Sequence, residues 1–184
     1  FVTYDEAAFY GPKIDIMIYD ALGREWQCAT EQLDFIQPER FDLKYTDTDG
    51  IEKTPVMIHK ALLGSIERFL SVYIEHTAGA FPLWLAPEQI ILLPIADRHM
   101  EYAKEVNKEL LVNNIRSRID ARQERLQAKI RDATLQKVPL LGIIGDKEVA
   151  VQAITVRART GEDLGKMKLL QFLQKLKEDI DKKR

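Results

Sequence analysis

The architecture of this chain can be read from residues 56–74, which run Val-Met-Ile-His-Lys-Ala-Leu-Leu-Gly-Ser-Ile-Glu-Arg-Phe-Leu-Ser-Val-Tyr-Ile. The first half alternates, with His59 on one side and Ile58 on the other, as in a strand that is covered on both faces. After Gly64 the period becomes helical, because Ser65 can cap a helix and an apolar stripe follows. The stripe consists of Ile66, Phe69, Leu70, Tyr73 and Ile74. The stretch therefore predicts a strand that enters a helix through a Gly-Ser turn.

Arg68 is expected in the first turn of that helix, off the apolar stripe. Free backbone N–H groups and the positive end of the helix dipole lie beside this position, so an arginine there can bind a phosphate. The alternative is a surface arginine that pairs with Glu67 or Asp34, and geometry alone favours this alternative.

The residue identities point further. Pro-Val-Met-Ile-His at 55–59 and Gly-Ser-Ile-Glu-Arg-Phe at 64–69 resemble the third signature motif of class II aminoacyl-tRNA synthetases, in the form carried by threonyl-tRNA synthetases. Further segments resemble the same family in order and spacing, namely residues 8–15, 26–30, 32–35, 80–87 and 145–148. The resemblance covers essentially the whole chain.

Composition is that of an ordinary soluble protein. The 184 residues, 46% hydrophobic and 30% charged, allow one large or two small domains. No apolar run approaches the ~20 residues of a membrane span, and we expect no secretory signal. The single cysteine, Cys28, excludes an internal disulfide and fits a reducing compartment, so we expect a cytoplasmic protein with no membrane partner. Because Phe1 is not a methionine, the natural chain is expected to begin earlier.

Charge is divided unevenly along the chain. Residues 1–86 hold 7 Lys+Arg against 14 Asp+Glu, whereas residues 87–184 hold 20 against 15. The net charges of −7 and +5 make the second half the one expected to meet a phosphate backbone. A helical surface rich in solvated lysines is the alternative.

The pattern of elements changes at the same place. Residues 13–20 and 25–35 alternate as an antiparallel hairpin, residues 38–53 are a polar excursion, and the motif strand and helix follow. Gly79 and Pro82 break the helix, and the domain boundary is expected there, giving domains 1–86 and 87–184. Beyond it, strands are expected at 89–95, 115–120, 138–145 and 153–158, with helices at 99–113, 126–137 and 165–182. The pattern and the resemblance together predict an α+β part followed by an α/β part: the C-terminal part of an antiparallel-sheet class II catalytic domain, then a mixed-sheet anticodon-binding domain.

Several residues of the first domain have two interpretations. Without the resemblance, His59 is interpreted as a core or surface histidine whose hydrogen bonds are made within the protein. Tyr10 and Lys13 are then interpreted as part of a turn with a packed aromatic ring. Gln27, Thr30 and Gln32 are interpreted as one polar face of a sheet. The resemblance implies that His59 is one of three ligands of a zinc ion, the other two being a cysteine and a histidine from an earlier part of the chain. The implied roles are threonine binding for Tyr10 and Gln32, contact with the reacting carboxylate and α-phosphate for Lys13, ATP binding for Gln27 and Thr30, and γ-phosphate binding for Arg68. Arg68 and His59 are then expected to border one pocket.

In the second domain the resemblance implies an anticodon-reading surface. Arg131, Glu148 and Arg157 match positions that contact anticodon bases, and Gln123 stands where the family commonly has Asn. Arginines and carboxylates suit the open edges of single-stranded loop bases. Ion pairing on a helix surface, worth roughly 0.5 kcal/mol for each pair, is the alternative. The Gly-Glu-Asp-Leu-Gly-Lys-Met segment at 161–167 is one residue short of a phosphate-binding loop and lacks its Ser/Thr.

The function implied is a ligase that joins threonine to tRNA(Thr) through a threonyl-adenylate, with ATP, Mg²⁺ and Zn²⁺ as reactant and cofactors. The fragment by itself is expected to be inactive, and the full-length enzyme is expected to be a homodimer. One alternative is an RNA-binding module without catalysis. Another is a different class II synthetase, such as the prolyl or histidyl enzyme.

Overall fold

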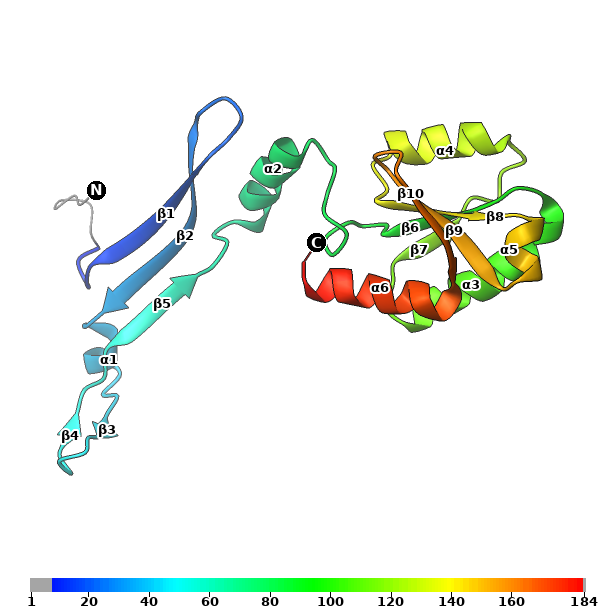
Figure 1. The fold of residues 1–184 in the computed structure, drawn as a ribbon. Helices are drawn as coiled ribbons and strands as arrows, with labels where there is room; N and C mark the ends of the chain where they lie inside the picture. The colour runs from blue at the N-terminus through cyan, green and yellow to red at the C-terminus, as the bar shows by residue number, and fades with distance from the viewer. Residues whose placement is uncertain (1–7, 184) are drawn as a thin grey trace. The chain divides into compact units, whose positions relative to one another are not determined.

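The computed structural model describes residues 8–183, and these divide into two compact units. Unit 1 ends at Ala78 and unit 2 begins at Gly79 (Figure 1). The expected functional boundary between residues 86 and 87 stays a prediction.

A three-stranded antiparallel sheet forms the main part of unit 1. Its strands are β1 (Lys13–Tyr19), β2 (Glu25–Asp34) and β5 (Met57–Ala61), in the order β1-β2-β5 (Figure 1). The expected hairpin is confirmed, and the polar excursion holds the short helix α1 (Gln37–Arg40) and a two-stranded ribbon of β3 (Tyr45–Thr46) and β4 (Glu52–Lys53). Sequence alternation and turn residues therefore predicted this sheet well.

The turn between β5 and the following helix α2 (Ile66–Thr77) is as predicted. The Ser65 hydroxyl accepts a hydrogen bond from the backbone N–H of Arg68 at 3.3 Å, which caps the helix. Gly64 has a φ of +60°, and a Cβ there would lie 2.7 Å from the carbonyl oxygen of Cys28. Only glycine fits both constraints, and it sets where α2 begins.

One expectation for β5 is wrong. The alternating stretch predicted a strand covered on both faces, but Val56, Ile58 and Leu62 are 48%, 62% and 69% exposed. The physical reason is that β5 is an edge strand of a three-stranded sheet, and no described element of unit 1 covers this apolar side. An apolar pattern shows which contacts a side chain is suited to make, and the described residues of unit 1 do not supply that contact.

A five-stranded mixed sheet forms the centre of unit 2, in the order β10-β9-β8-β6-β7. The strands are β6 (Ile90–Pro94), β7 (Ser117–Ile119), β8 (Leu140–Ile144), β9 (Ala153–Ala158) and β10 (Asp163–Lys168). β6 is parallel to both of its neighbours, β7 and β8, whereas β9 is antiparallel to β8 and β10. The expected mixed sheet is confirmed.

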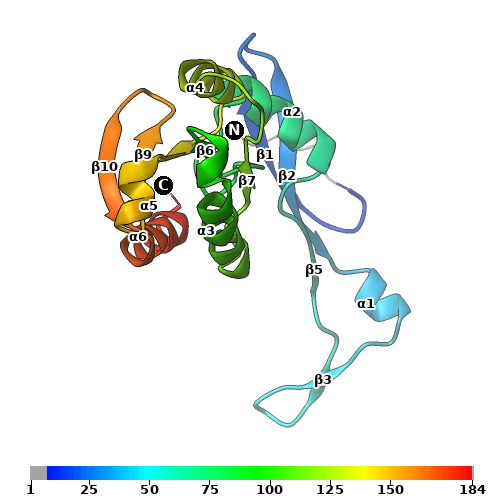
Figure 2. The same cartoon turned by 90° about the vertical axis from the view of Figure 1, so that its right-hand side faces the viewer.

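Helices cover both faces of this sheet. α3 (Met100–Val112), which follows the short 3₁₀ turn η1 (Asp97–His99), and α6 (Leu169–Asp181) lie on one face, and α4 (Leu126–Leu135) lies on the other (Figures 1 and 2). The apolar side chains of α3 and of the centre of α6 that contribute to the core are buried, namely Ala103, Val106, Leu110, Phe172, Leu173 and Leu176. β6 contributes to the apolar core on both faces of the sheet, since all five of its residues are buried.

The expected helix at 165–182 begins too early, because residues 163–168 form strand β10. Lys166 lies opposite Thr155 of β9 and Lys168 opposite Ala153, so the segment gains the hydrogen bonds of a sheet edge. Gly161, with a φ of +95°, provides the turn between the two strands. The short helix α5 (Asp146–Ala150) was also missed, because five residues carry too little periodicity to detect.

None of the helices within residues 8–183 is both long and apolar enough to cross a membrane.

Candidate functional site

Three of the predicted site residues form one row across the sheet of unit 1. Lys13 of β1 is paired with Gln32 of β2, and Gln32 is paired with His59 of β5. Residues that face each other directly across strands project from the same side of a sheet. The row therefore gathers a cation, an amide and an imidazole from segments that are far apart in sequence.

A β-bulge brings Gln27 onto the same side. Gln27 and Thr30 are three residues apart, so a regular strand would place them on opposite faces. The register shifts where Ile16 and Met17 of β1 meet β2, and this insertion reverses the alternation. Gln27 Nε2 consequently donates to Asp15 Oδ1 at 2.6 Å, and Asp15 is the direct partner of Thr30. Both predicted ATP contacts thus lie on the side that carries Lys13, Gln32 and His59.

Asp15 is a member of this group that the sequence interpretation missed. Its carboxylate lies 2.7 Å from Lys13 Nζ, and Lys13, followed by Thr30, lowers the pKa of Asp15. The carboxylate is therefore charged at neutral pH and fixes both the ammonium group and the Gln27 amide. The available signal was its position two residues after Lys13, which puts both on one strand face.

Tyr10 joins the row from the segment before β1. Its hydroxyl donates to Gln32 Oε1 at 3.2 Å, and its ring centroid lies 6.3 Å from that of His59 in an edge-on arrangement. Tyr10 and Gln32, which are predicted to bind threonine, therefore lie close to His59, which is predicted to bind zinc.

His59 is held by a buried carboxylate. His59 Nε2 lies 2.9 Å from Oδ2 of Asp34, whose exposure is 0%. Burial opposes ionisation of Asp34, but the backbone N–H of Gln37 and the imidazole lower its pKa overall. An imidazole with one nitrogen on a carboxylate presents its other nitrogen, Nδ1, as a metal ligand. His59 therefore fits as one ligand of a zinc ion, while residues 8–183 contain no group of three or more His, Cys, Asp or Glu that could hold a metal.

Arg68 lies at the other end of β2. Its Nη1 donates to the carbonyl oxygen of Gln27 at 3.1 Å, and the guanidinium carbon lies 5.8 Å from the centre of the Trp26 ring. Glu67 accepts instead from the Ser65 hydroxyl, so the pairing of Arg68 with Glu67 is not the one formed. From Gln27 to Gln32, strand β2 advances roughly 15 Å. Arg68 and the row of Lys13, Gln32 and His59 can therefore contact the same ligand only if that ligand spans this distance. A pocket bordered by both stays a prediction.

In unit 2, Glu148 is the most buried of the predicted residues, at 8% exposure. Its Oε2 accepts from the backbone N–H of Gly145 at 3.0 Å, and its Oε1 accepts from the Thr155 hydroxyl at 2.9 Å. Burial alone would raise the pKa of Glu148, but the Thr155 hydroxyl and the Gly145 N–H lower it overall. The result is a fixed, charged acceptor at the start of α5.

The helix that carries Glu148 is anchored at its first residue. Asp146 accepts two hydrogen bonds from Arg98, at 2.8 and 2.6 Å, and lies 2.9 Å from Nε2 of the buried His99. The Arg98 guanidinium, followed by His99, holds the pKa of Asp146 well below its usual range. This cluster was not predicted, since it joins residues 47 and 48 positions apart.

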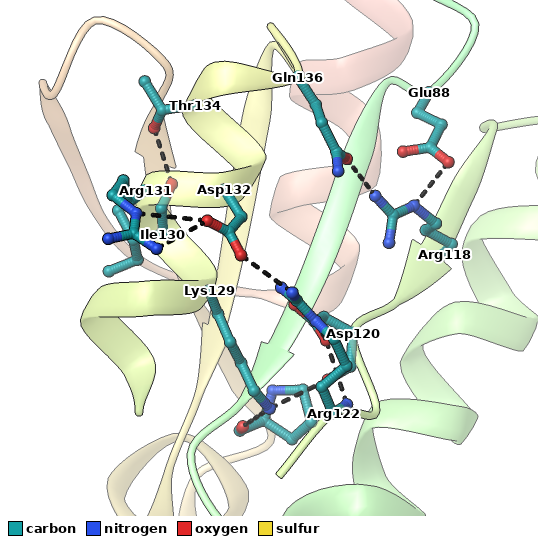
Figure 3. Close-up of polar contacts among 11 residues, drawn as sticks. Glu88, Arg118, Asp120, Arg122, Lys129, Ile130, Arg131, Asp132, Thr134 and Gln136 are labelled. Atoms are coloured by element: carbon teal, nitrogen blue, oxygen red, sulfur yellow. Dashed lines mark hydrogen bonds and ion pairs between the residues drawn. The ribbon is translucent and has the colours of Figure 1, made fainter. Parts of the chain in front are cut away.

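The other three candidates lie on or beside the α4 side of unit 2. Arg157 follows Thr155 by two residues in β9, so both point to one face, and Arg157 Nε donates to the carbonyl of Gly161 at 3.2 Å. Gln123 lines a cavity of about 470 Å³ at the carboxyl ends of the parallel strands β6 and β7. Crevices of this kind, where the chain direction switches between helices on opposite faces, are the usual ligand sites of open α/β sheets. Arg131 projects from α4 (Figure 3).

A network of charges that the sequence interpretation missed supports the loop of Gln123. Asp120, 3% exposed, accepts from the backbone N–H, Nε and Nη2 of Arg122, the last at 2.6 Å. Arg122 lowers the pKa of Asp120. The buried Lys129 donates to the carbonyl oxygens of Pro94 and Asp120, both at 3.1 Å, and so ties the ends of β6 and β7 together (Figure 3).

Comparison with known proteins agrees with this architecture. The family model described as tRNA synthetase class II core domain (G, H, P, S and T) matches residues 2–77, and the one described as anticodon binding domain matches residues 89–179. Together they define a class II aminoacyl-tRNA synthetase in which part of the core precedes an anticodon-binding domain.

Individual relatives narrow the family. The chain is 51% identical to a threonine–tRNA ligase of Natranaerobius thermophilus over 98% of its length, and 52% identical to one of Aquifex aeolicus over 96%. The RNA-binding domain of threonyl-tRNA synthetase from Cryptosporidium parvum is a structural neighbour, with a TM-score of 0.86 and 41% identity, covering 94% of this chain and 44% of that one. The chain belongs to the threonine–tRNA ligase family. It spans 28% of the length of either relative.

Proposed function

We propose that this chain is the part of a threonine–tRNA ligase that completes the pocket for ATP and threonine and reads the anticodon of tRNA(Thr). The observation that carries the proposal is the single polar face of β1, β2 and β5, on which Lys13, Gln32 and His59 are direct neighbours. Residues 1–86 would serve the catalytic part and residues 87–184 the anticodon-binding part.

The geometry of unit 1 supports specific roles for its side chains. Arg68, at the N-terminus of α2, would bind the γ-phosphate of ATP, and Lys13 would balance charge at the reacting carboxylate and α-phosphate. Gln27 and Thr30 would bind ATP, and Tyr10 and Gln32, which already share a hydrogen bond, would bind threonine. In this chemistry the protein positions the reactants and neutralises phosphate charge, so Mg²⁺ with ATP fits the same face.

His59, oriented by Asp34, would supply one of three ligands of a zinc ion. Bound zinc would distinguish threonine from valine through the side-chain hydroxyl, since a site built to bind that oxygen penalises its absence. The remaining residues of this face would orient the threonine around that contact.

The charges of unit 2 support RNA binding. Gln123, Arg131, Glu148 and Arg157 would read the bases of the anticodon loop, since open base edges suit amide, guanidinium and carboxylate groups. A homodimer is proposed for the full-length enzyme by family analogy alone. A reducing compartment such as the cytoplasm is proposed from the single cysteine, Cys28.

Threonine-dependent exchange of pyrophosphate into ATP tests the proposal in the longest natural chain that contains these residues. Exchange with threonine, lost in an Arg68→Ala variant that still binds tRNA, is the expected result. Exchange that responds to proline or histidine instead would assign another class II synthetase.

RNA binding without catalysis is the second candidate, and one observation favours it. Unit 2 has a buried core of its own, whereas the apolar side of unit 1 is exposed. A full chain that binds tRNA(Thr) but gives no exchange with any amino acid would support this candidate over the ligase.

A further inference from the structure

Asp132, on α4, lies between two arginines of different elements (Figure 3). Its Oδ2 accepts from Nη1 of Arg122 at 2.9 Å, and its Oδ1 accepts from both Nε and Nη2 of Arg131 at 3.3 Å. One carboxylate therefore joins the loop after β7 to the exposed surface of α4. The sequence resemblance assigned a role to Arg131 but none to Asp132.

The two arginines are held very differently. Arg122 is also bound in a fork by Asp120, whose side chain is only 2% exposed, so its guanidinium is fixed between two carboxylates. Arg131 is 72% exposed, and both of its bonds to Asp132 are long. Asp132 is thus fixed by Arg122, while Arg131 is oriented by Asp132 and can still exchange that contact for another ligand.

An arginine near RNA has two competing uses. Contact with phosphate adds affinity that depends on salt and carries no sequence information, whereas a planar fork toward a base edge gives discrimination. A carboxylate beside the guanidinium reduces its attraction for phosphate and limits the planes that the group can adopt. The arrangement around Arg131 therefore favours recognition of a base edge over contact with phosphate.

We propose that Asp132 is a positioning residue that determines specificity: it presents the Arg131 guanidinium to an anticodon base edge and suppresses its contact with phosphate. This inference rests on the proposed anticodon-reading function. The partner chemistry is a single-stranded RNA loop with an unpaired base, seated beside the crevice lined by Arg122 and Gln123.

Removal of the carboxylate charge should therefore move two quantities in opposite directions. With Asp132→Asn, the ratio of affinities for tRNA(Thr) and for the same tRNA with an exchanged anticodon should fall about tenfold, the value of one good base contact. Affinity for the exchanged tRNA should rise about two- to threefold at physiological salt, with a steeper salt dependence. A merely structural residue would lower both affinities together, and that result would overturn the inference.

Asp179→Asn is the matched control. Asp179 lies on α6, on the opposite face of the sheet, and its side chain is 29% exposed, against 28% for Asp132. It also pairs with a basic residue, Lys175. The same charge change there should leave the affinity ratio unaltered, and an equal fall in the ratio would overturn the inference.

A double variant tests whether the effect passes through Arg131. In an Arg131→Gln background, Asp132→Asn should not lower the ratio further, and a further loss would place the effect elsewhere. Should Asp132→Asn fail to fold, Asp132→Glu keeps the charge and displaces the contact. The ratio should then fall without a gain in affinity for the exchanged tRNA, and an unaltered ratio would overturn the inference.

The unsubstituted (parent) protein serves to distinguish a failure of the proposed anticodon-reading function from a failure of the inference about Asp132. A parent that binds both tRNAs equally contradicts the proposed function and the inference with it. A parent that prefers tRNA(Thr), together with an Asp132→Asn variant of unaltered preference, contradicts the inference alone.

Discussion

The two units of this chain bury apolar surface to very different extents. Among the described residues, and leaving prolines aside, the buried apolar side chains of unit 1 are Cys28 and Val72, whereas unit 2 has twenty. In unit 1 the side chains of Ile14 and Ile16 are 66% and 54% exposed, although the opposite, polar face holds Lys13 at 26%. Within unit 1 taken by itself, the polar face of the sheet is therefore less exposed than the apolar face.

This difference shows how each candidate site is held. In unit 1 the site residues are aligned by strand register, one bulge and hydrogen bonds of Asp15 and Asp34, with little core beneath them. In unit 2 a closed core fixes the strand ends, and ion pairs of Asp120 and Asp146 then fix the loops. Substitutions in the two units should therefore differ most where they test packing.

The largest difference is expected for leucine truncation. Leu92 is 0% exposed in β6, so Leu92→Ala should lower the free energy of unfolding of unit 2 by about 2–5 kcal/mol. Leu62 is 69% exposed, so Leu62→Ala should cost less than about 0.5 kcal/mol. Urea denaturation with hydrogen exchange resolved by unit measures both. Equal costs would mean that the apolar side of unit 1 is packed in solution, which would break the comparison.

A smaller effect is expected for the turn before α2. Gly64→Ala combines an unfavourable left-handed backbone with a contact of 2.7 Å to the Cys28 carbonyl, and should destabilise unit 1 by about 1–3 kcal/mol. Gly50→Ala is the control, because its φ of +76° carries the same backbone cost with no atom within 4 Å. Thermal unfolding measures the effect on stability. Threonine-dependent pyrophosphate exchange, in the longest natural chain that contains these residues, measures the effect on the proposed role of Arg68. Equal effects of both variants would show that the close approach to Cys28 is unimportant.

The sequence predicted strands and helices in both units because alternation, helical spacing and turn glycines are local signals. It failed at 163–168, where the pairing of Lys166 with Thr155 across a turn outweighed a pattern that also suits a helix. It also failed for the coverage of Ile58, because the presence of a partner surface is not encoded in the strand that needs one.

The candidate site shows the same division. His59, Gln32 and Lys13 were identified by family resemblance, and their alignment in one row follows from register, which single-sequence reasoning did not supply. Asp15 and Asp132 were missed because their contacts with Gln27 and Arg122 join residues that are 12 and 10 positions apart in the sequence. A bulge of one residue decided the face of Gln27, and no turn or glycine marks it in the sequence.

Acid should weaken the hairpin of unit 1 through Asp20. Hydrogen bonds from the Trp26 indole, and from the backbone and side chain of Arg24, lower the pKa of Asp20 from 3.8 to about 2. A depressed pKa gives stability that is complete above pH 3.8 and is lost as the pH falls through about 2. The midpoint of unfolding, followed by Trp26 fluorescence in a Trp84→Phe background, should be higher for the parent than for Asp20→Asn at neutral pH. The two midpoints should converge near pH 2. A difference that stays constant with pH would contradict the lowered pKa of Asp20.

The smallest effects are expected for exposed ion pairs, and here the two units should agree. Lys60 pairs with Glu31 across β2 and β5 of unit 1, and Lys104 pairs with Glu101 along α3 of unit 2. All four side chains are at least 44% exposed, so Lys60→Ala and Lys104→Ala should each change stability by about 0–1 kcal/mol, less at high salt. If the two substitutions change stability equally, and less at high salt, the units differ in apolar packing alone. A larger cost for Lys60, unaffected by salt, would mean that charge compensates in unit 1 for the missing core.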